Sequence, residues 1–371
     1  MSYAPKTRQE RVSNTIWHST SAGRFCRRQK LLLQTLSAIW YTTGHMRIVY
    51  MGSSSASAIC LRAIMRRPGL EVVGVVTQPD RPAGRGKVLT PCPCRAYAME
   101  RGIKNCITPE NVNSPESLEQ IRAWKPDVVV VVAFGQFLKE ELLNLPPLGC
   151  VNCHFSLLPK YRGASPVTAA LLAGDVVTGV SVIRMGIGMD DGPVLLKQVE
   201  PIYSDDTGDT LMDKLSICGG VTLAKALKLM DAKKLPPPED QEEDKATFAH
   251  KIAKTDGLID WGKSSDFIER QLRAYTPWPG CYTFLPLRFR KKGNSGRVVV
   301  TGVEFAKVDP SRRNELPGTV LEVTKRGPVI RTGTTALLLT ALKPEGAKEM
   351  SGGAFLSGRP LEPIKDMLLC E

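Results

Sequence analysis

Apolar residues in the first two thirds of the chain alternate between short β-branched runs and longer stretches with helical spacing. The short runs predict strands, and apolar residues three and four positions apart predict helices. This alternation predicts an α/β fold with a doubly wound, Rossmann-like parallel sheet. The expected strands are 47–51, 71–77, 105–108, 127–134, 151–156, 179–185 and 194–199, and the expected helices are 56–67, 115–124, 167–173 and 211–230.

Two segments carry particularly clear local signals. The run 127–134 is an almost continuous series of Val residues, which is typical of a central parallel strand buried on both faces. Ser114 followed by Pro115 matches an N-cap and the first position of a helix. We therefore expect 127–134 at the centre of the sheet and a helix that begins after Ser114.

The last third of the chain has a different pattern. Residues 233–246 are rich in Pro and acidic residues, which is the composition of a linker. We therefore expect an α/β domain over 46–232 and a second domain over 247–371. A helix is expected at 265–274, and five short strands then predict a smaller OB-like β-barrel. Those strands are 281–285, 298–303, 318–323, 328–331 and 336–342.

The composition is that of a globular protein with a large core. The 371 residues are 42% hydrophobic and 23% charged, which excludes a wholly disordered chain and a collagen. No run reaches the roughly 18 apolar residues of a membrane-spanning helix, so no membrane association is expected. We also expect a monomer.

The formal net charge of +13 is unevenly distributed. Residues 46–244 hold 22 basic and 23 acidic residues, whereas residues 245–371 hold 21 basic and 13 acidic residues. A nearly neutral body with a basic appendage suggests a catalytic domain joined to a module that binds a polyanion. The alternative is a basic surface that serves only solubility.

The first 45 residues have seven basic residues, one acid and eleven Ser or Thr. An Arg-rich, Ser-rich and acid-poor leader is typical of an organellar transit peptide, and we expect it to lack fixed structure. The expected location is the mitochondrion, with the chloroplast or both organelles as alternatives. A solvated tail without a targeting role is the other interpretation.

The cysteine pattern contains two motifs that could bind a cofactor. Cys150-Val-Asn-Cys153-His154 matches the pattern for attachment of a c-type haem, and with Cys92 and Cys94 it could supply zinc ligands. Along a strand, Cys150 and Cys153 would point to opposite faces. We therefore expect neither haem nor metal.

Three polar residues could carry chemistry. Asn152 and His154 would share one face at the carboxyl end of a strand, where open α/β sheets bind ligands. Asp190 lies in a glycine-rich loop that could reach them. An amide can donate to an oxyanion, an imidazole can move a proton, and a carboxylate can orient the imidazole. This set suits direct transfer of an acyl-like group between two amines; the alternative is a buried histidine with satisfied hydrogen bonds.

A second candidate is the long basic loop 77–87, rich in Gly and Pro. It lacks the P-loop pattern, and Gly52-Ser-Ser-Ser lacks the dinucleotide fingerprint. The loop could contact a phosphodiester, or it could simply be a solvated surface loop.

The segment Asn152-Cys-His-Phe-Ser-Leu-Leu-Pro-Lys-Tyr-Arg-Gly163 resembles the signature of the folate-dependent formyltransferases. Asp190-x-Gly192 resembles the third catalytic position of that family. The segments 77–87, 259–261 and 275–279 resemble the branch that formylates methionyl-tRNA. The resemblance extends from about Met46 to the end of the chain.

The resemblance implies 10-formyltetrahydrofolate as formyl donor and the α-amine of initiator methionyl-tRNA as acceptor. It implies catalytic roles for Asn152, His154 and Asp190, and folate contacts from Ser156, Leu157, Leu158 and Pro159. Transfer RNA would be held by Arg81, Arg85 and Lys87 in the loop and by Arg290, Lys291 and Lys292 in the C-terminal domain. The alternatives are a formyltransferase with a small-molecule amine acceptor, a hydrolase of formyl-folate, and a nucleic-acid-binding protein with an inactive α/β domain.

Overall fold

The structure is a computed structural model that describes residues 45–83, 86, 88–289 and 295–368. All of these residues lie in one compact unit of the chain, 44–371. The expected leader, 1–45, lies outside the described residues apart from His45. Among the residues described, no helix combines the length and apolar character needed to cross a membrane.

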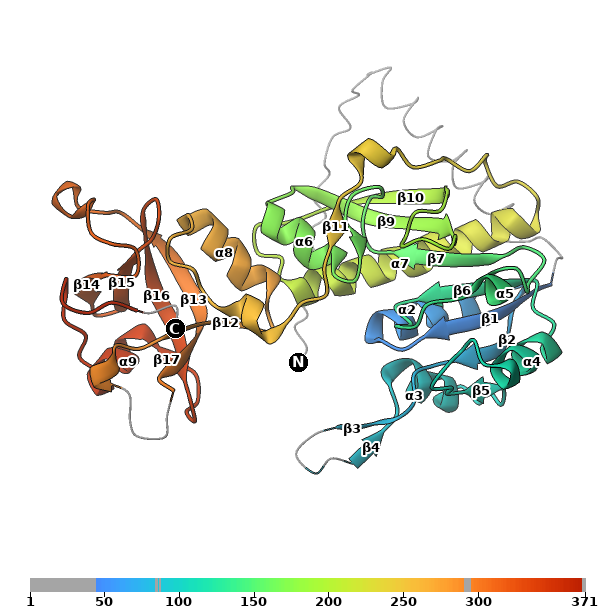
Figure 1. Ribbon diagram of the computed structural model, residues 1–371, viewed down its shortest axis with the longest axis horizontal. Coiled ribbons are helices and arrows are strands. Elements are labelled where there is room, and N and C mark those ends of the chain that lie inside the picture. Colours follow the sequence, from blue (N-terminus) through green and yellow to red (C-terminus); the bar gives the residue numbers. More distant parts are fainter. Residues whose placement is uncertain (1–44, 84–85, 87, 290–294, 369–371) are drawn as a thin grey trace, which may run out of the picture. The chain divides into compact units, whose positions relative to one another are not determined.

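A seven-stranded sheet forms the centre of the first domain, in the order β10-β9-β7-β6-β1-β2-β5 (Figure 1). The all-valine strand β6 lies at its middle, parallel to both β1 and β7. This confirms the central position expected for that run. The bounds are β1 Met46–Gly52, β2 Leu70–Val76, β5 Cys106–Ile107, β6 Val128–Val132, β7 Cys150–His154, β9 Val177–Arg184 and β10 Val194–Pro201.

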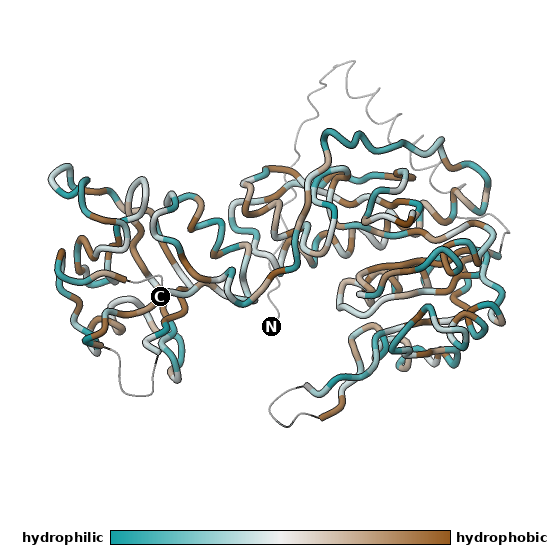
Figure 2. The backbone as a smooth tube through the Cα atoms, viewed as in Figure 1, coloured by the Kyte–Doolittle hydropathy of each residue, from teal (hydrophilic) through white to brown (hydrophobic). Residues whose placement is uncertain are grey.

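Helices cover both faces of this sheet. Alternate valines of β6 pack into two separate cores, one beneath α2, α3, α6 and α7 and the other beneath α4 and α5. The central strands β1 and β6 are accordingly hydrophobic along most of their length (Figure 2). Ser114 accepts from the Ser117 amide and caps α4, as its sequence predicts. The helices are α2 Ser55–Met65, α3 Pro93–Glu100, α4 Pro115–Ala123, α5 Glu140–Leu143, α6 Pro166–Ala173 and α7 Gly208–Asp231.

The direction of one strand differs from the expectation of a wholly parallel sheet. β9 runs antiparallel to both of its neighbours, β7 and β10. The pairing with β10 follows from the connection, because the loop 185–193 turns the chain back directly, whereas a parallel pair needs a long crossover. The remaining strands, β7-β6-β1-β2-β5, are parallel, so the Rossmann-like character holds there.

The five strands expected in the C-terminal domain are all present. They form one antiparallel sheet in the order β12-β13-β16-β15-β14, with β17 beside β16. Helix α8, Ser265–Ala274, has the predicted bounds and packs against α6. The bounds are β12 Cys281–Phe284, β13 Arg297–Ala306, β14 Val320–Thr324, β15 Gly327–Arg331, β16 Ala336–Pro344, β17 Met350–Ser351 and α9 Gly352–Gly358.

Short elements complete the chain. The hairpin β3–β4 projects from the loop after β2, and β8 pairs in parallel with β11. β11 follows the segment predicted as a linker, so that segment returns to the first domain. The bounds are β3 Arg81–Ala83, β4 Val88–Thr90, β8 Arg162–Gly163 and β11 Phe248–Ala249, and the 3₁₀ turns are Glu243–Lys245, Lys254–Gly257, Leu287–Phe289 and Pro310–Arg312.

Candidate active site

Strand β7 presents Asn152 and His154 on the same side. Its alternation sends Cys153 into the core beneath α7 and Cys150 into the opposite core beneath α5. The two cysteines therefore face opposite sides, as predicted from the strand pattern. In the described part of the chain, no group of three or more His, Cys, Asp or Glu side chains is arranged to hold a metal ion.

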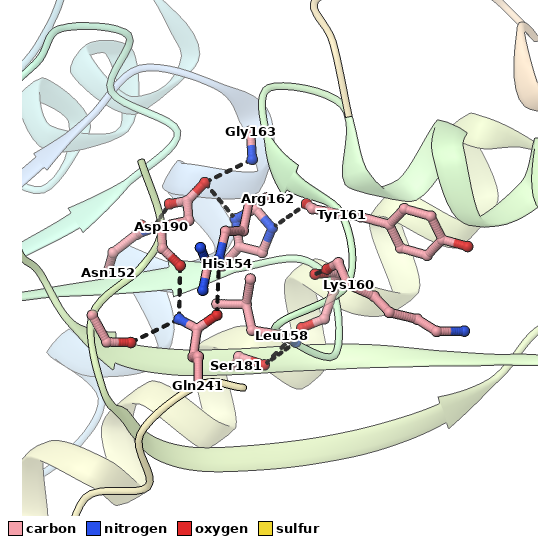
Figure 3. Close-up of polar contacts among 12 residues, drawn as sticks. Asn152, His154, Leu158, Lys160, Tyr161, Arg162, Gly163, Ser181, Asp190 and Gln241 are labelled. Carbon is pink, nitrogen blue, oxygen red and sulfur yellow. Dashed lines mark hydrogen bonds and ion pairs between the residues drawn. The ribbon is translucent and has the colours of Figure 1, made fainter. Parts of the chain in front are cut away.

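Asp190 meets these two side chains from the loop between β9 and β10 (Figure 3). Its Oδ1 accepts from the Asn152 amide Nδ2 at 3.1 Å, and its Oδ2 accepts from the Gly163 backbone N–H at 2.9 Å. The same Oδ2 lies 3.4 Å from Nδ1 of His154. The three predicted catalytic residues thus form one cluster, in which the side chain of His154 is 5% exposed and that of Asp190 is 17% exposed.

The backbone of the Asp190 loop is tightly constrained. Asp190 has a φ of +52°, in the left-handed region that Asp tolerates better than most residues. A Cβ added at Gly192 would lie 1.8 Å from the carbonyl oxygen of Arg184, so only glycine fits there. The Asp-x-Gly pattern is therefore explained by the turn that aims the carboxylate at Asn152 and His154.

The His154 ring lies between two acceptors. Nε2 is 2.8 Å from the carbonyl oxygen of Tyr161, whereas Nδ1 is 3.4 Å from Oδ2 of Asp190, so we assign the proton of the neutral ring to the shorter contact, at Nε2. Nδ1 then faces the Asp190 carboxylate and can donate to it when the ring takes up a second proton. The Tyr161 hydroxyl donates to Asp175 at 2.8 Å. Burial, together with that hydrogen bond, raises the pKa of Tyr161 to about 12.

Hydrogen bonds within the first domain fix the turn Ser156–Pro159, which is predicted to contact folate. The Ser156 hydroxyl donates to the Lys160 carbonyl, and the Leu158 amide donates to the Ser181 hydroxyl at 3.0 Å. Ser156 and Leu158 are buried, whereas Leu157 and Pro159 are partly exposed. Only Leu157 and Pro159 therefore present side-chain surface to a ligand.

Most of the residues predicted to bind RNA lie outside the described residues: Arg85, Lys87, Arg290, Lys291 and Lys292. Arg81 is described; it lies on β3 and pairs with Glu110 at 3.1 Å, with both side chains mostly exposed.

Two arginines that flank residues 290–292 in the sequence, Arg288 and Arg297, interact within the protein. Arg288 pairs with Glu362 and Asp366, and Arg297 stacks on the Tyr282 ring.

The structure adds residues that the sequence patterns did not single out. Gln241 lies in the segment predicted as a linker, yet its side chain reaches the Asp190 loop. The hydroxyl of Ser53, in the first loop, accepts from the backbone N–H of Gln78 and donates to the Phe134 carbonyl. The contacts of Gln241 could not be predicted because its segment has the composition of a linker. The contacts of Ser53 could not be predicted because no periodic pattern indicates them.

A cavity of about 210 Å³ adjoins the start of the Asp190 loop. Leu143, Cys150, Met185 and Ile187 give it an apolar lining, and Glu140, Asn144 and Arg184 are its polar residues. Gly149 and Gly186 complete it with backbone. Asn152, His154 and Asp190 do not line this cavity, which lies at the start of β7.

Comparisons with known proteins cover both domains of the chain. The formyl transferase family model matches residues 46–227, and the model for the formyl transferase C-terminal domain matches residues 251–360. The chain is 40% identical over 318 residues to the methionyl-tRNA formyltransferase of Geobacter sulfurreducens, covering 86% of this chain and 95% of that protein. It is also 40% identical over 317 residues to the Bacillus subtilis methionyl-tRNA formyltransferase, covering 85% of this chain and 96% of that one.

Two solved structures share the fold at low sequence identity. HypX from Aquifex aeolicus, in complex with tetrahydrofolic acid, has a TM-score of 0.52 at 15% identity and covers 87% of this chain and 51% of its own. WlaRD, a sugar 3N-formyl transferase, has a TM-score of 0.53 at 16% identity and covers 82% of this chain and 100% of its own.

Proposed function

The chain belongs to the formyl transferase family, and from that premise we propose that it transfers a formyl group from 10-formyltetrahydrofolate to the α-amine of initiator methionyl-tRNA. The observation that carries this proposal is the identity of about 40% to methionyl-tRNA formyltransferases over nearly their whole length. The match includes the C-terminal domain as well as the catalytic one. An enzyme of this kind supplies formylated initiator tRNA for translation.

The cluster around Asp190 is suited to this reaction. When bound, 10-formyltetrahydrofolate supplies the formyl group. Asn152 donates one amide hydrogen to Asp190. It can donate its second amide hydrogen to the formyl oxygen as that atom gains negative charge. The acceptor amine loses one proton and the departing folate nitrogen gains one, so His154 and Asp190 need only relay a proton between them.

Folate is proposed to contact the turn Ser156–Pro159, which lies just after His154 in the chain. Leu157 and Pro159 have exposed side-chain surface for folate contact, whereas Ser156 and Leu158 are buried and stabilise the turn.

Transfer RNA is proposed to bind the loop 77–87 and the basic C-terminal domain. The C-terminal domain carries the positive excess of the chain beyond the leader, and Arg290, Lys291 and Lys292 stand together in its sequence. Arg81, Arg85 and Lys87 are the proposed contacts from the loop. Arg288 and Arg297, on either side of these three residues in the sequence, interact with Glu362 and Tyr282 within the protein.

The direct test is an assay of formyl transfer from 10-formyltetrahydrofolate to charged initiator tRNA. Formylmethionyl-tRNA is the expected product. Parallel reactions with uncharged tRNA, glycinamide ribonucleotide and no acceptor separate this function from a small-molecule formyltransferase and from a hydrolase. Transfer to glycinamide ribonucleotide alone, or formate release without transfer, would refute it.

The leader 1–45 is proposed to direct the enzyme to mitochondria. It precedes the family match, which begins at residue 46, and its basic, acid-poor composition supports the proposal. Import of the full chain into isolated mitochondria or chloroplasts, compared with a chain that begins at Met46, tests it. Equal import of both chains, or uptake of neither, would refute a targeting role.

A further inference from the structure

The side chain of Gln241 bridges the backbone on both sides of Asp191. Its Nε2 donates to the carbonyl oxygen of Asp190 at 2.7 Å and to that of Gly192 at 2.7 Å. Both hydrogens of one amide are thereby used on the loop that carries the catalytic carboxylate (Figure 3). Asp190 has a left-handed φ, which is unfavourable for residues other than glycine, and these two hydrogen bonds stabilise that backbone conformation.

Gln241 is itself held by a buried arginine. Arg162 Nε donates to Gln241 Oε1 at 3.1 Å, so every hydrogen-bonding group of the amide has a partner. The other two guanidinium nitrogens donate to the Glu243 carboxylate at 2.9 and 2.7 Å in a bidentate pair. Arg162 has a side chain only 4% exposed, whereas that of Glu243 is 72% exposed.

Further hydrogen bonds hold the segment 239–249 in place on either side of Gln241. Glu239 forms an antiparallel bridge with Val194, which directly follows the Asp190 loop. Farther on, the Thr247 carbonyl accepts from the Arg162 amide, and the Thr247 hydroxyl accepts from the amide of Tyr161. The segment 239–249 therefore spans the loop of Asp190 and the loop whose Tyr161 carbonyl faces His154.

We propose that Gln241, oriented by Arg162 and Glu243, is a positioning residue that fixes the Asp190 carboxylate against Asn152 and His154. This inference rests on the proposed function, because it concerns the formyl transfer step. The role requires a neutral amide. An amide can donate to two carbonyl oxygens while accepting from Arg162. A carboxylate would place one negative oxygen against both carbonyls, and a thioether would donate nothing.

Gln241→Glu and Gln241→Met are the informative variants, because both keep the length of the side chain. Displacement of a catalytic group by about 1 Å can lower the rate roughly 10²-fold, so we expect kcat to fall by about that factor in both. The KM for each substrate should change little, since Gln241 is assigned no substrate contact. Gln198→Glu, the same change on the exposed part of β10, is the matched control and should keep wild-type kcat.

A double-mutant cycle distinguishes positioning from a general structural effect. If Gln241 acts through Asp190, adding Gln241→Glu to Asp190→Asn lowers kcat by no more than about twofold further. An independent structural defect would instead multiply the two losses. Melting temperatures and circular dichroism of each variant establish the folded fraction, and Gln241→Met gives the answer if the charged variant does not fold.

Three outcomes would overturn the proposal: unchanged kcat in both Gln241 variants, losses that multiply in the Asp190→Asn background, or losses fully accounted for by unfolded protein. The wild-type chain, assayed in parallel, separates the two hypotheses. An inactive wild type toward methionyl-tRNA refutes the proposed function and the positioning role together. An active wild type with insensitive Gln241 variants refutes the positioning role alone.

Discussion

Replacement of Asp190 by Asn tests the core of the proposed mechanism. The carboxylate accepts from Asn152 on one oxygen and from Gly163 on the other, at 3.1 and 2.9 Å. An Asn side chain has only one oxygen. In either orientation its NH₂ group must therefore face a donor, either the amide of Asn152 or the backbone N–H of Gly163.

The size of the two expected effects can be compared. Losing one hydrogen bond to a charged group costs roughly 1.5–3 kcal/mol, which lowers the melting temperature by several degrees in a protein of this size. Loss of a positioned acid–base group lowers kcat by roughly 10²–10⁴-fold. The activity of Asp190→Asn should therefore fall far more than its folded fraction, with the KM for folate and for tRNA changed little.

The assay is steady-state formylation of methionyl-tRNA at saturating 10-formyltetrahydrofolate, with melting temperatures measured on the same preparations. Asp191→Asn makes the same chemical change one residue later, where the side chain is exposed, and is the matched control. Asp190→Asn with kcat within about threefold of wild type and a lower melting temperature would show that the carboxylate only supports the fold.

Asn152→Ala should lower kcat by roughly 10²–10³-fold with little change in either KM, as for a lost oxyanion donor; a rise in KM at constant kcat would contradict this role. Changing Arg290, Lys291 and Lys292 together to Ala should raise the KM for tRNA and flatten its salt dependence, with the KM for folate unchanged; equal effects on both substrates would indicate a structural cluster. Asp206→Asn should destabilise the fold by roughly 1.5–3 kcal/mol at pH 7, because the carboxylate accepts from Lys214 at 2.7 Å. Burial alone raises the pKa of Asp206, but hydrogen bonds from Lys214, Tyr203 and Thr210 outweigh it and lower the pKa. The stability that Asp206 contributes is therefore present above about pH 4 and is lost as the pH falls through the folded-state pKa. A melting-temperature difference from wild type that persists at pH 2 would contradict this assignment.

The local pattern of the chain determined most of the secondary structure. The valine run predicted the central strand because every residue, not only every second one, must be apolar when both faces of a strand are covered. The cap at Ser114 and the bounds of α8 depend on side chains adjacent in sequence. The shared face of Asn152 and His154 follows in the same way from the period of a strand.

Only the tertiary structure decided the direction of β9, the meeting of Asp190 with His154, and the contacts of Gln241. Each of these three features depends on the path of a loop. A loop brings together residues that are far apart in the sequence, and no periodic pattern of apolar residues predicts such contacts. Gln241 is 51 residues from Asp190 in sequence, in a stretch whose Pro and acidic content is typical of a linker. Its role depends on hydrogen bonds to backbone carbonyls, which every residue possesses and no sequence pattern identifies.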